Sequence, residues 1–120
     1  MFRQRRKDMT LEERIEHLEF KMDLLRQGGE FEKFLYDCDI TKEQLKALYK
    51  VMDEISDEIG KGRKVSSSTY ENKILSVVDS RKLDYHFCET FAKMLWEDNC
   101  YVEVFPALYS GHMKFQDLFK

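Results

Sequence analysis

The residues best suited to metal chemistry lie in the C-terminal half of the chain: His86, Cys88, Cys100 and His112. Imidazole nitrogens and thiolates are the ligands that zinc prefers, and a structural zinc site uses four of them. Here the order is His-x-Cys, eleven residues, Cys, eleven residues, His. Structural sites normally begin with two cysteines only two to four residues apart, and that knuckle is missing. We therefore expect no metal centre, and we interpret the cysteines as small core residues.

Evidence for other catalytic sites is equally weak. A nucleophilic cysteine paired with His86 or His112 is an alternative that the sequence supports no better than the zinc site. A phosphate-binding loop, a His-Glu-x-x-His pair and a nucleophile elbow are all missing from the sequence. The acidic run 53–58 lacks the spacing and the glycine of a calcium loop, so it is interpreted as the solvated face of a helix. We expect a protein that is not an enzyme and that has no cofactor.

Aromatic residues are frequent between positions 87 and 105: Phe87, Phe91, Trp96, Tyr101 and Phe105. They could line a pocket for a small molecule, but such a pocket also needs convergent polar groups, and the sequence does not identify any. Their helical spacing favours a core instead.

Composition favours one all-α domain, a multi-helix bundle. The chain has 120 residues, 42% of them hydrophobic, with a single proline and five glycines. Basic residues number 20 against 23 acidic ones, and this mild acidity argues against general nucleic-acid binding. Four basic residues nevertheless gather near the start: Arg3, Arg5, Arg6 and Lys7. We expect a flexible basic arm over 1–9 and a helical domain over 10–120, with nucleic-acid contact by the arm as the alternative function.

Capping signals divide the domain into helices. Thr10 with Glu13, Thr41 with Gln44, and Ser68 with Glu71 form capping boxes. Together with Gly28, Gly60, Asp84 and Asn99 they predict helices over 11–27, 30–36, 41–60, 68–80, 85–97 and 100–109, with an exposed connection near 60–68.

Two features complicate the C-terminal end. Pro106 means that the last helix is either kinked or starts late. The apolar tail residues Phe115, Leu118 and Phe119 either pack as a final turn or dock on a partner.

The first predicted helix carries a row of apolar residues at steps of four and three: Leu11, Ile15, Leu18, Met22 and Leu25. In heptad notation leucine occupies every d position, and Ile15 and Met22 occupy a, which is the seam of a coiled coil. A second apolar stripe of His17, Phe20 and Leu24 lies on the opposite side. One side would dock on its own domain and the other would meet a second copy, so we expect a homo-oligomer.

Charged residues flank this seam. Arg14 and Lys21 occupy g positions, and Glu12 and Glu19 occupy e positions. In a parallel pair Arg14 would face Glu19 of the other copy favourably, but Lys21 would face Arg26 unfavourably. The orientation of the helices stays open at this point.

Cysteine count and hydropathy bear on location. Three cysteines, an odd number, and no apolar signal-peptide core are typical of a cytoplasmic protein with free thiols. No apolar run reaches the 18 or so residues that a membrane span requires, so we expect no membrane partner.

Five segments carry a resemblance to a known family. They are 14–20 (RIEHLEF), 41–44 (TKEQ), 52–55 (MDEI), 89–92 (ETFA) and 104–105 (VF), and with this order the chain resembles the YhaI-like family of small Bacillus proteins over most of its length. The resemblance implies an all-helical, self-associating cytosolic protein without established activity, and it offers no catalytic residues to transfer. Pro106 and the tail after Tyr109 are departures from the family pattern. We therefore expect an interaction or regulatory adaptor, with a further protein partner still to be identified.

Overall fold

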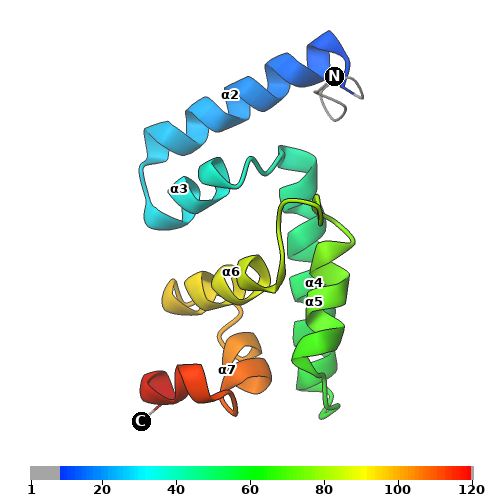
Figure 1. Cartoon of the computed structure of the whole chain (residues 1–120), viewed down its shortest axis with the longest axis vertical. Coiled ribbons are helices and arrows are strands. Elements are labelled where there is room, and N and C mark those ends of the chain that lie inside the picture. The colour runs from blue at the N-terminus through cyan, green and yellow to red at the C-terminus, as the bar shows by residue number, and fades with distance from the viewer. Residues whose placement is uncertain (1–8, 120) are drawn as a thin grey trace. The chain divides into compact units, whose positions relative to one another are not determined.

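In a computed structural model, residues 9–119 are described and are helical throughout their regular structure, with no strand in that range. The elements, in chain order, are α2 (Leu11–Gln27), α3 (Glu30–Asp37), α4 (Lys42–Gly60), α5 (Ser67–Leu75), α6 (Tyr85–Glu97), α7 (Val104–Tyr109) and the 3-10 helix η1 (Met113–Phe119) (Figure 1). The all-α, multi-helix fold predicted from composition and capping signals is confirmed.

The chain divides into two compact units, Met1–Leu45 and Lys46–Lys120. The division falls inside α4, just after its first turn. The connection predicted near 60–68 therefore lies within the second unit, where residues 61–66 follow α4 as an exposed or half-exposed turn. A single domain over 10–120 stays a prediction.

In the first unit, α2 begins at the expected capping box. The Glu13 backbone N–H donates to Thr10 Oγ1 at 3.1 Å, and the Thr10 N–H donates to Glu13 Oε1 at 2.8 Å. The helix ends at Gly28, whose φ of 71° is a left-handed conformation that glycine adopts without steric cost. The chain then turns into α3, which packs against α2. Phe31 and Leu35 are the buried residues of α3.

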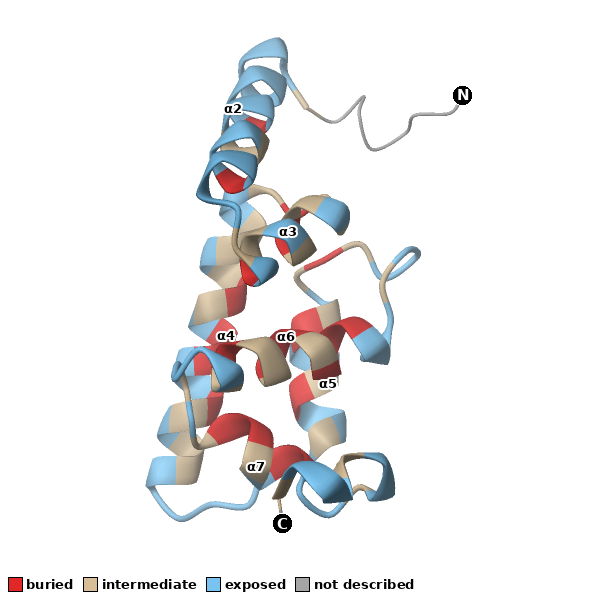
Figure 2. Cartoon of the chain, turned by 90° about the vertical axis from the view of Figure 1, so that its left-hand side faces the viewer, coloured by how far each residue is buried: buried red, intermediate tan, exposed pale blue. Residues whose placement is uncertain are grey.

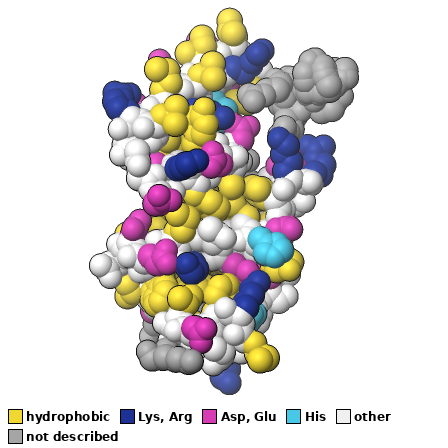
Figure 3. All heavy atoms as spheres, turned by 60° about the vertical axis from the view of Figure 1, so that its left-hand side comes forward, with side chains coloured by type: hydrophobic (Ala, Val, Ile, Leu, Met, Phe, Trp, Pro, Cys, Tyr) yellow, Lys and Arg dark blue, Asp and Glu magenta, His cyan; other side chains and the backbone are white. Residues whose placement is uncertain are grey.

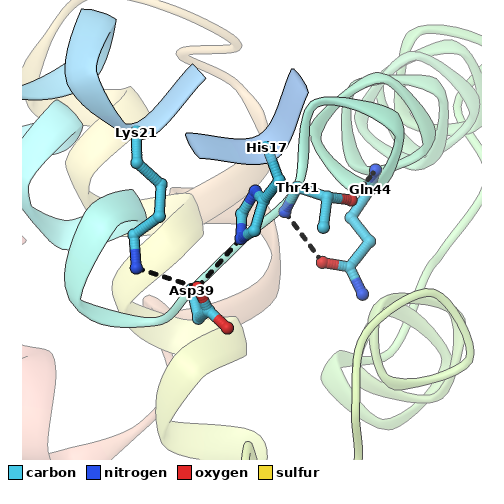
Figure 4. Close-up of polar contacts among 5 residues, drawn as sticks. All are labelled: His17, Lys21, Asp39, Thr41 and Gln44. Carbon is cyan, nitrogen blue, oxygen red and sulfur yellow. Dashed lines mark hydrogen bonds and ion pairs between the residues drawn. The ribbon is translucent and has the colours of Figure 1, made fainter. Parts of the chain in front are cut away.

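The start of α4 matches its prediction as well. The Thr41 N–H donates to Gln44 Oε1 and the Gln44 N–H donates to Thr41 Oγ1, each at 3.0 Å (Figure 4). This reciprocal pair satisfies two backbone donors that a helix start leaves without partners. Further along, α4 buries one apolar stripe: Leu48, Val51, Met52 and Ile55.

The second unit is built around aromatic side chains. Phe105 of α7 is fully buried, and four rings lie with their centroids 5.1–5.7 Å from its own: Trp96, Tyr109, Phe115 and Phe119. The tail therefore packs as a final turn, which was one of the two expected outcomes. Of the three apolar residues in the tail (Phe115, Leu118 and Phe119), only Leu118 is exposed.

Two helix boundaries differ from the sequence prediction. The N-cap of α5 is Ser66 rather than Ser68, because Ser66 has an extended backbone and its hydroxyl accepts from the Thr69 N–H at 3.1 Å. The helix also ends at Leu75 rather than near residue 80. At this observed end the Ser76 hydroxyl donates to the Lys73 carbonyl at 2.7 Å. Residues 76 and 77 then form a turn, and Val78 is buried outside any helix.

The last α-helix starts late, at Val104 instead of Cys100. Asn99 and Tyr101 have φ values of 62° and 49°, which are incompatible with a continuous right-handed helix. Pro106 is consequently the third residue of α7, within the first turn, where backbone N–H groups have no intrahelical acceptor. The proline thus ends up where its missing N–H costs least.

Candidate functional site

The predicted seam of α2 lies on the surface. All five of its side chains are exposed, from 49% for Ile15 to 70% for Leu11, with Leu18, Met22 and Leu25 between these values. Figure 2 shows α2 exposed along nearly all of its length, and Figure 3 shows hydrophobic side chains gathered over α2. These five residues are called the α2 row below. An exposed apolar row of this length is unusual for a surface helix, which normally turns its apolar stripe inward.

The opposite side of α2 faces its own unit. His17 and Leu24, seven residues apart and so two turns along the helix, are its buried residues, and Phe20 between them is half-buried. The predicted two-sided helix is therefore present, with one side inside the first unit and the other side in solvent.

A polar network fixes the buried side of α2 (Figure 4). His17 Nε2 lies 2.9 Å from Asp39 Oδ1, and Lys21 Nζ donates to the same oxygen at 2.9 Å. Both basic residues come from α2, one turn apart, whereas Asp39 follows α3. One oxygen of the Asp39 carboxylate thus links two residues of α2 to the end of α3.

The electrostatics of this network favour the ionised carboxylate. Burial alone would raise the pKa of Asp39, but the hydrogen bonds and charges of Lys21 and His17 outweigh it, so the pKa of Asp39 is lowered. The His17 Nδ1 atom is buried and makes no hydrogen bond within residues 9–119. Its ring therefore contributes to the interior both as an apolar surface and as the partner of Asp39.

Sequence reasoning placed His17 and Lys21 on α2 but did not include Asp39. The sequence did contain a signal, namely a short polar residue just after the predicted short helix. Such residues are among the few that tolerate a left-handed backbone, and Asp39 has a φ of 58° in the structure. An Asp two residues past a short helix therefore indicates a turn. Which residues of α2 this turn meets depends on tertiary packing.

The cysteines considered for metal or thiol chemistry differ in their surroundings. Among residues 9–119, no three His, Cys, Asp or Glu side chains are placed to hold one metal ion. Cys88 is buried, with its Sγ 3.7 Å from the Asp84 carbonyl and 3.9 Å from that of Glu71, while Cys100 is exposed. Burial raises the pKa of the Cys88 thiol to about 12, with the nearby Glu71 adding to the effect. A thiol in that state is a poor nucleophile at neutral pH.

The aromatic residues considered for a pocket are packed against one another. Phe91 and Phe105 are fully buried, and Phe87 stacks on Phe91 with ring centroids 5.8 Å apart. Tyr101 stacks on Tyr49 at 6.5 Å and donates a hydrogen bond to Asp53 Oδ1 at 2.5 Å. These contacts make the group a core with one hydroxyl at its edge.

The acidic run lies on the outer face of α4, as the sequence predicted. Asp53, Glu54 and Asp57 are exposed, whereas Ile55 within the same run is buried. Part of this charge is compensated locally, because Lys73 Nζ of α5 lies 3.6 Å from Glu54 Oε1.

The predicted basic arm, Arg3, Arg5, Arg6 and Lys7, lies outside the described residues. Three further basic residues, Lys61, Arg63 and Lys64, are candidates to join the arm in nucleic-acid contact, and the first two are paired with acidic residues of α4. Lys61 Nζ lies 3.0 Å from Asp57 Oδ2, and Arg63 Nη1 lies 2.8 Å from Glu58 Oε2. These two charges are therefore partly neutralised at the end of α4.

No helix within residues 9–119 has both the length and the apolar content that a membrane crossing needs. Comparisons with protein-family models, with curated proteins and with solved structures find no match to this chain. The resemblance to the YhaI-like family stays a prediction.

Proposed function

We propose that this chain self-associates through the α2 row and works in the cytoplasm as an interaction or regulatory adaptor rather than as an enzyme. The observation that carries the proposal is the exposure of every member of the row, at the spacing of a coiled-coil seam. The three free cysteines are in keeping with a reducing compartment. A further protein partner would bind the assembled form.

The buried side of α2 keeps the helix folded before any association takes place. A short isolated helix is only marginally stable in water, so a coiled coil of about two heptads would normally have to form its helices on association. Here Leu24 and His17 already anchor α2 within the first unit, and Thr10 and Gly28 cap its ends. Association through the row therefore requires little additional ordering of the backbone.

The row is long enough for a weak complex. Complete burial of an exposed Leu, Ile or Met side chain is worth about 1.5–3 kcal/mol, so these partly covered side chains would add about 1 kcal/mol each. Ten of them, from two copies, supply about 10 kcal/mol, against a cost of about 4–15 kcal/mol for lost translational and rotational freedom. The surplus is at most about 6 kcal/mol, so we expect reversible association with a dissociation constant no tighter than roughly tens of micromolar.

The test is the solution mass of the protein, measured by light scattering over a dilution series. We expect the unmodified chain to associate and a variant with Ile15→Glu and Leu18→Glu to be monomeric, because two buried charges per copy would interrupt the seam. A matched control carries Val102→Glu and Met113→Glu, which place two charges on exposed apolar residues outside the row. The control should associate like the unmodified chain.

Circular dichroism separates loss of association from loss of folding. Both substituted residues of the row are exposed, so the variant should keep its helical signal. A monomeric unmodified chain, or a row variant that associates as tightly as the control, would refute the proposal.

A further inference from the structure

We propose that the α2 rows of two copies pair in parallel and in register. This inference rests on the proposed function and adds the orientation of the helices, which the sequence alone left undecided. It commits the row to one occupant, the same row of a second copy.

The charges beside the row differ between its two flanks. One flank, the g positions, carries Arg14 and Lys21, and the other flank, the e positions, carries Glu12, Glu19 and, at the end of the helix, Arg26. In a parallel pair each g flank faces the e flank of the other copy, so Arg14 faces Glu19 and Lys21 faces Arg26. In an antiparallel pair g faces g and e faces e, which brings Arg14 beside Lys21 and Glu12 beside Glu19. The parallel pair therefore contains an attractive contact that the antiparallel pair lacks.

The strongest complementary pair is available at the surface. Arg14 and Glu19 are both exposed, and neither forms an ion pair with another residue in the range 9–119. Because a g residue contacts the e residue five positions later in the other copy, Arg14 of each copy would meet Glu19 of the other. A parallel pair contains this contact twice.

One pair of like charges had argued against the parallel arrangement, namely Lys21 facing Arg26. The structure shows that both cations already have partners in their own chain. Lys21 Nζ donates to Asp39 at 2.9 Å and lies 4.5 Å from the centre of the Tyr36 ring, while Arg26 is bonded to Asp23. Lys21 is drawn toward the buried side of α2, away from the row, so its repulsion of a second copy is reduced.

The apolar residues agree with the charges. Leucine at every d position, with the β-branched Ile15 at one a position, favours a parallel two-stranded coiled coil. Met22 at the other a position is flexible and adapts to the packing of its neighbours.

The experiment reverses the charges that define the orientation and measures the dissociation constant by sedimentation or light scattering at low salt. In a parallel pair, Arg14→Glu alone and Glu19→Arg alone should each weaken association roughly tenfold, because two attractive contacts become repulsive. The double variant restores opposite charges and should associate like the unmodified chain. Glu16→Arg is the matched control, since this exposed b position points away from the row.

The opposite arrangement predicts the opposite sign. In an antiparallel pair, Arg14→Glu would bring a glutamate beside Lys21 of the other copy, and Glu19→Arg would bring an arginine beside Glu12. Each single variant would then associate more tightly than the unmodified chain, and the double variant more tightly still. That result would overturn the parallel arrangement while leaving the proposed function intact. Loss of association in Glu16→Arg would also overturn it, whereas a monomeric unmodified chain would refute both proposals.

Discussion

Helices α2 and α6 show two ways in which the same kind of apolar pattern is used. Both begin at a side-chain cap, and both carry apolar residues at steps of three and four. Yet α6, the shorter helix, buries six residues, whereas α2 buries only His17 and Leu24. The six residues of α6 are Phe87, Cys88, Glu89, Phe91, Ala92 and Leu95.

The difference lies in the width of the stripe. The apolar residues of α6 cover a broad face, and α6 packs against both α5 and α7. The α2 row is a narrow a and d seam, and its own unit covers only the opposite side. A broad stripe thus indicates a core within the chain, and a narrow seam with charged flanks indicates a partner. The energetic consequence is that the second unit should depend on internal packing, while the row should matter only on association.

Phe105→Ala is expected to have the largest effect and tests the internal side of this contrast. It removes the ring at the centre of the aromatic core and should lower the free energy of unfolding of the second unit by about 3–5 kcal/mol. Denaturant unfolding followed by circular dichroism measures this loss. Met113→Ala serves as the control, because this side chain is 88% exposed and should change stability by less than about 0.5 kcal/mol. A similar cost for both would mean that Phe105 is not a core residue.

Substitutions of two leucines on α2 compare its two sides directly. Leu24→Ala removes a buried side chain and should destabilise the first unit by about 2–4 kcal/mol. Leu18→Ala removes an exposed one, so the stability of the monomer should stay within about 0.5 kcal/mol while association weakens. Unfolding at a concentration below the dissociation constant, together with light scattering above it, separates the two effects. If Leu18→Ala destabilised the monomer as much as Leu24→Ala, the row would be part of the core.

The network beneath α2 should give the first unit a dependence on acid. The pKa of Asp39 is lowered in the folded protein, from a usual value near 3.8. Its contribution to stability is therefore complete above that usual value and is lost as the pH falls through the lower pKa of the folded state. Asp39→Asn keeps a residue that tolerates the left-handed backbone and should cost about 1–2 kcal/mol at neutral pH.

Unfolding by denaturant at neutral pH and near pH 3 measures this dependence. The difference in unfolding free energy between the unmodified chain and Asp39→Asn should shrink in acid. A difference that does not change with pH would show that the charge of Asp39 contributes nothing to holding α2 and α3 together.

Much of the fold could be predicted because its signals are local. The caps at Thr10, Thr41 and Asp84 and the left-handed residues Gly28 and Asn99 each act within one turn, and the structure confirms the helix ends that they predict. The heptad seam predicted that its own domain leaves the α2 row uncovered, and all five side chains of the row are exposed in the structure. What would cover the row is not a local signal, because a seam has the same pattern for any helical partner.

The missed features depend on residues that are distant in sequence. Asp39 meets His17 and Lys21 across 22 and 18 positions, so no local pattern contains the network. The late start of α7 depends on the left-handed Tyr101, whose hydroxyl bonds to Asp53, 48 positions earlier. Tertiary contacts of this kind override helix propensity over short segments.

The capping of α5 offers the smallest expected effect, and it tests whether helix ends or the core dominate the second unit. Two serines compete in the sequence, and the structure assigns the cap to Ser66, whose hydroxyl accepts from the Thr69 N–H. Ser66→Ala should therefore lower the unfolding free energy by about 0.5–1 kcal/mol. Ser68→Ala should change it little or raise it slightly, because this exposed residue lies inside the helix and alanine is the better helix former. The two variants have identical compositions, so the sign of the difference between their free energies of unfolding, measured with denaturant, identifies the cap. If Ser66→Ala lowered the unfolding free energy as much as Phe105→Ala, the end of α5 would determine the stability of the second unit as much as its core does. The contrast between a unit stabilised by its core and a row buried only on association would then be wrong.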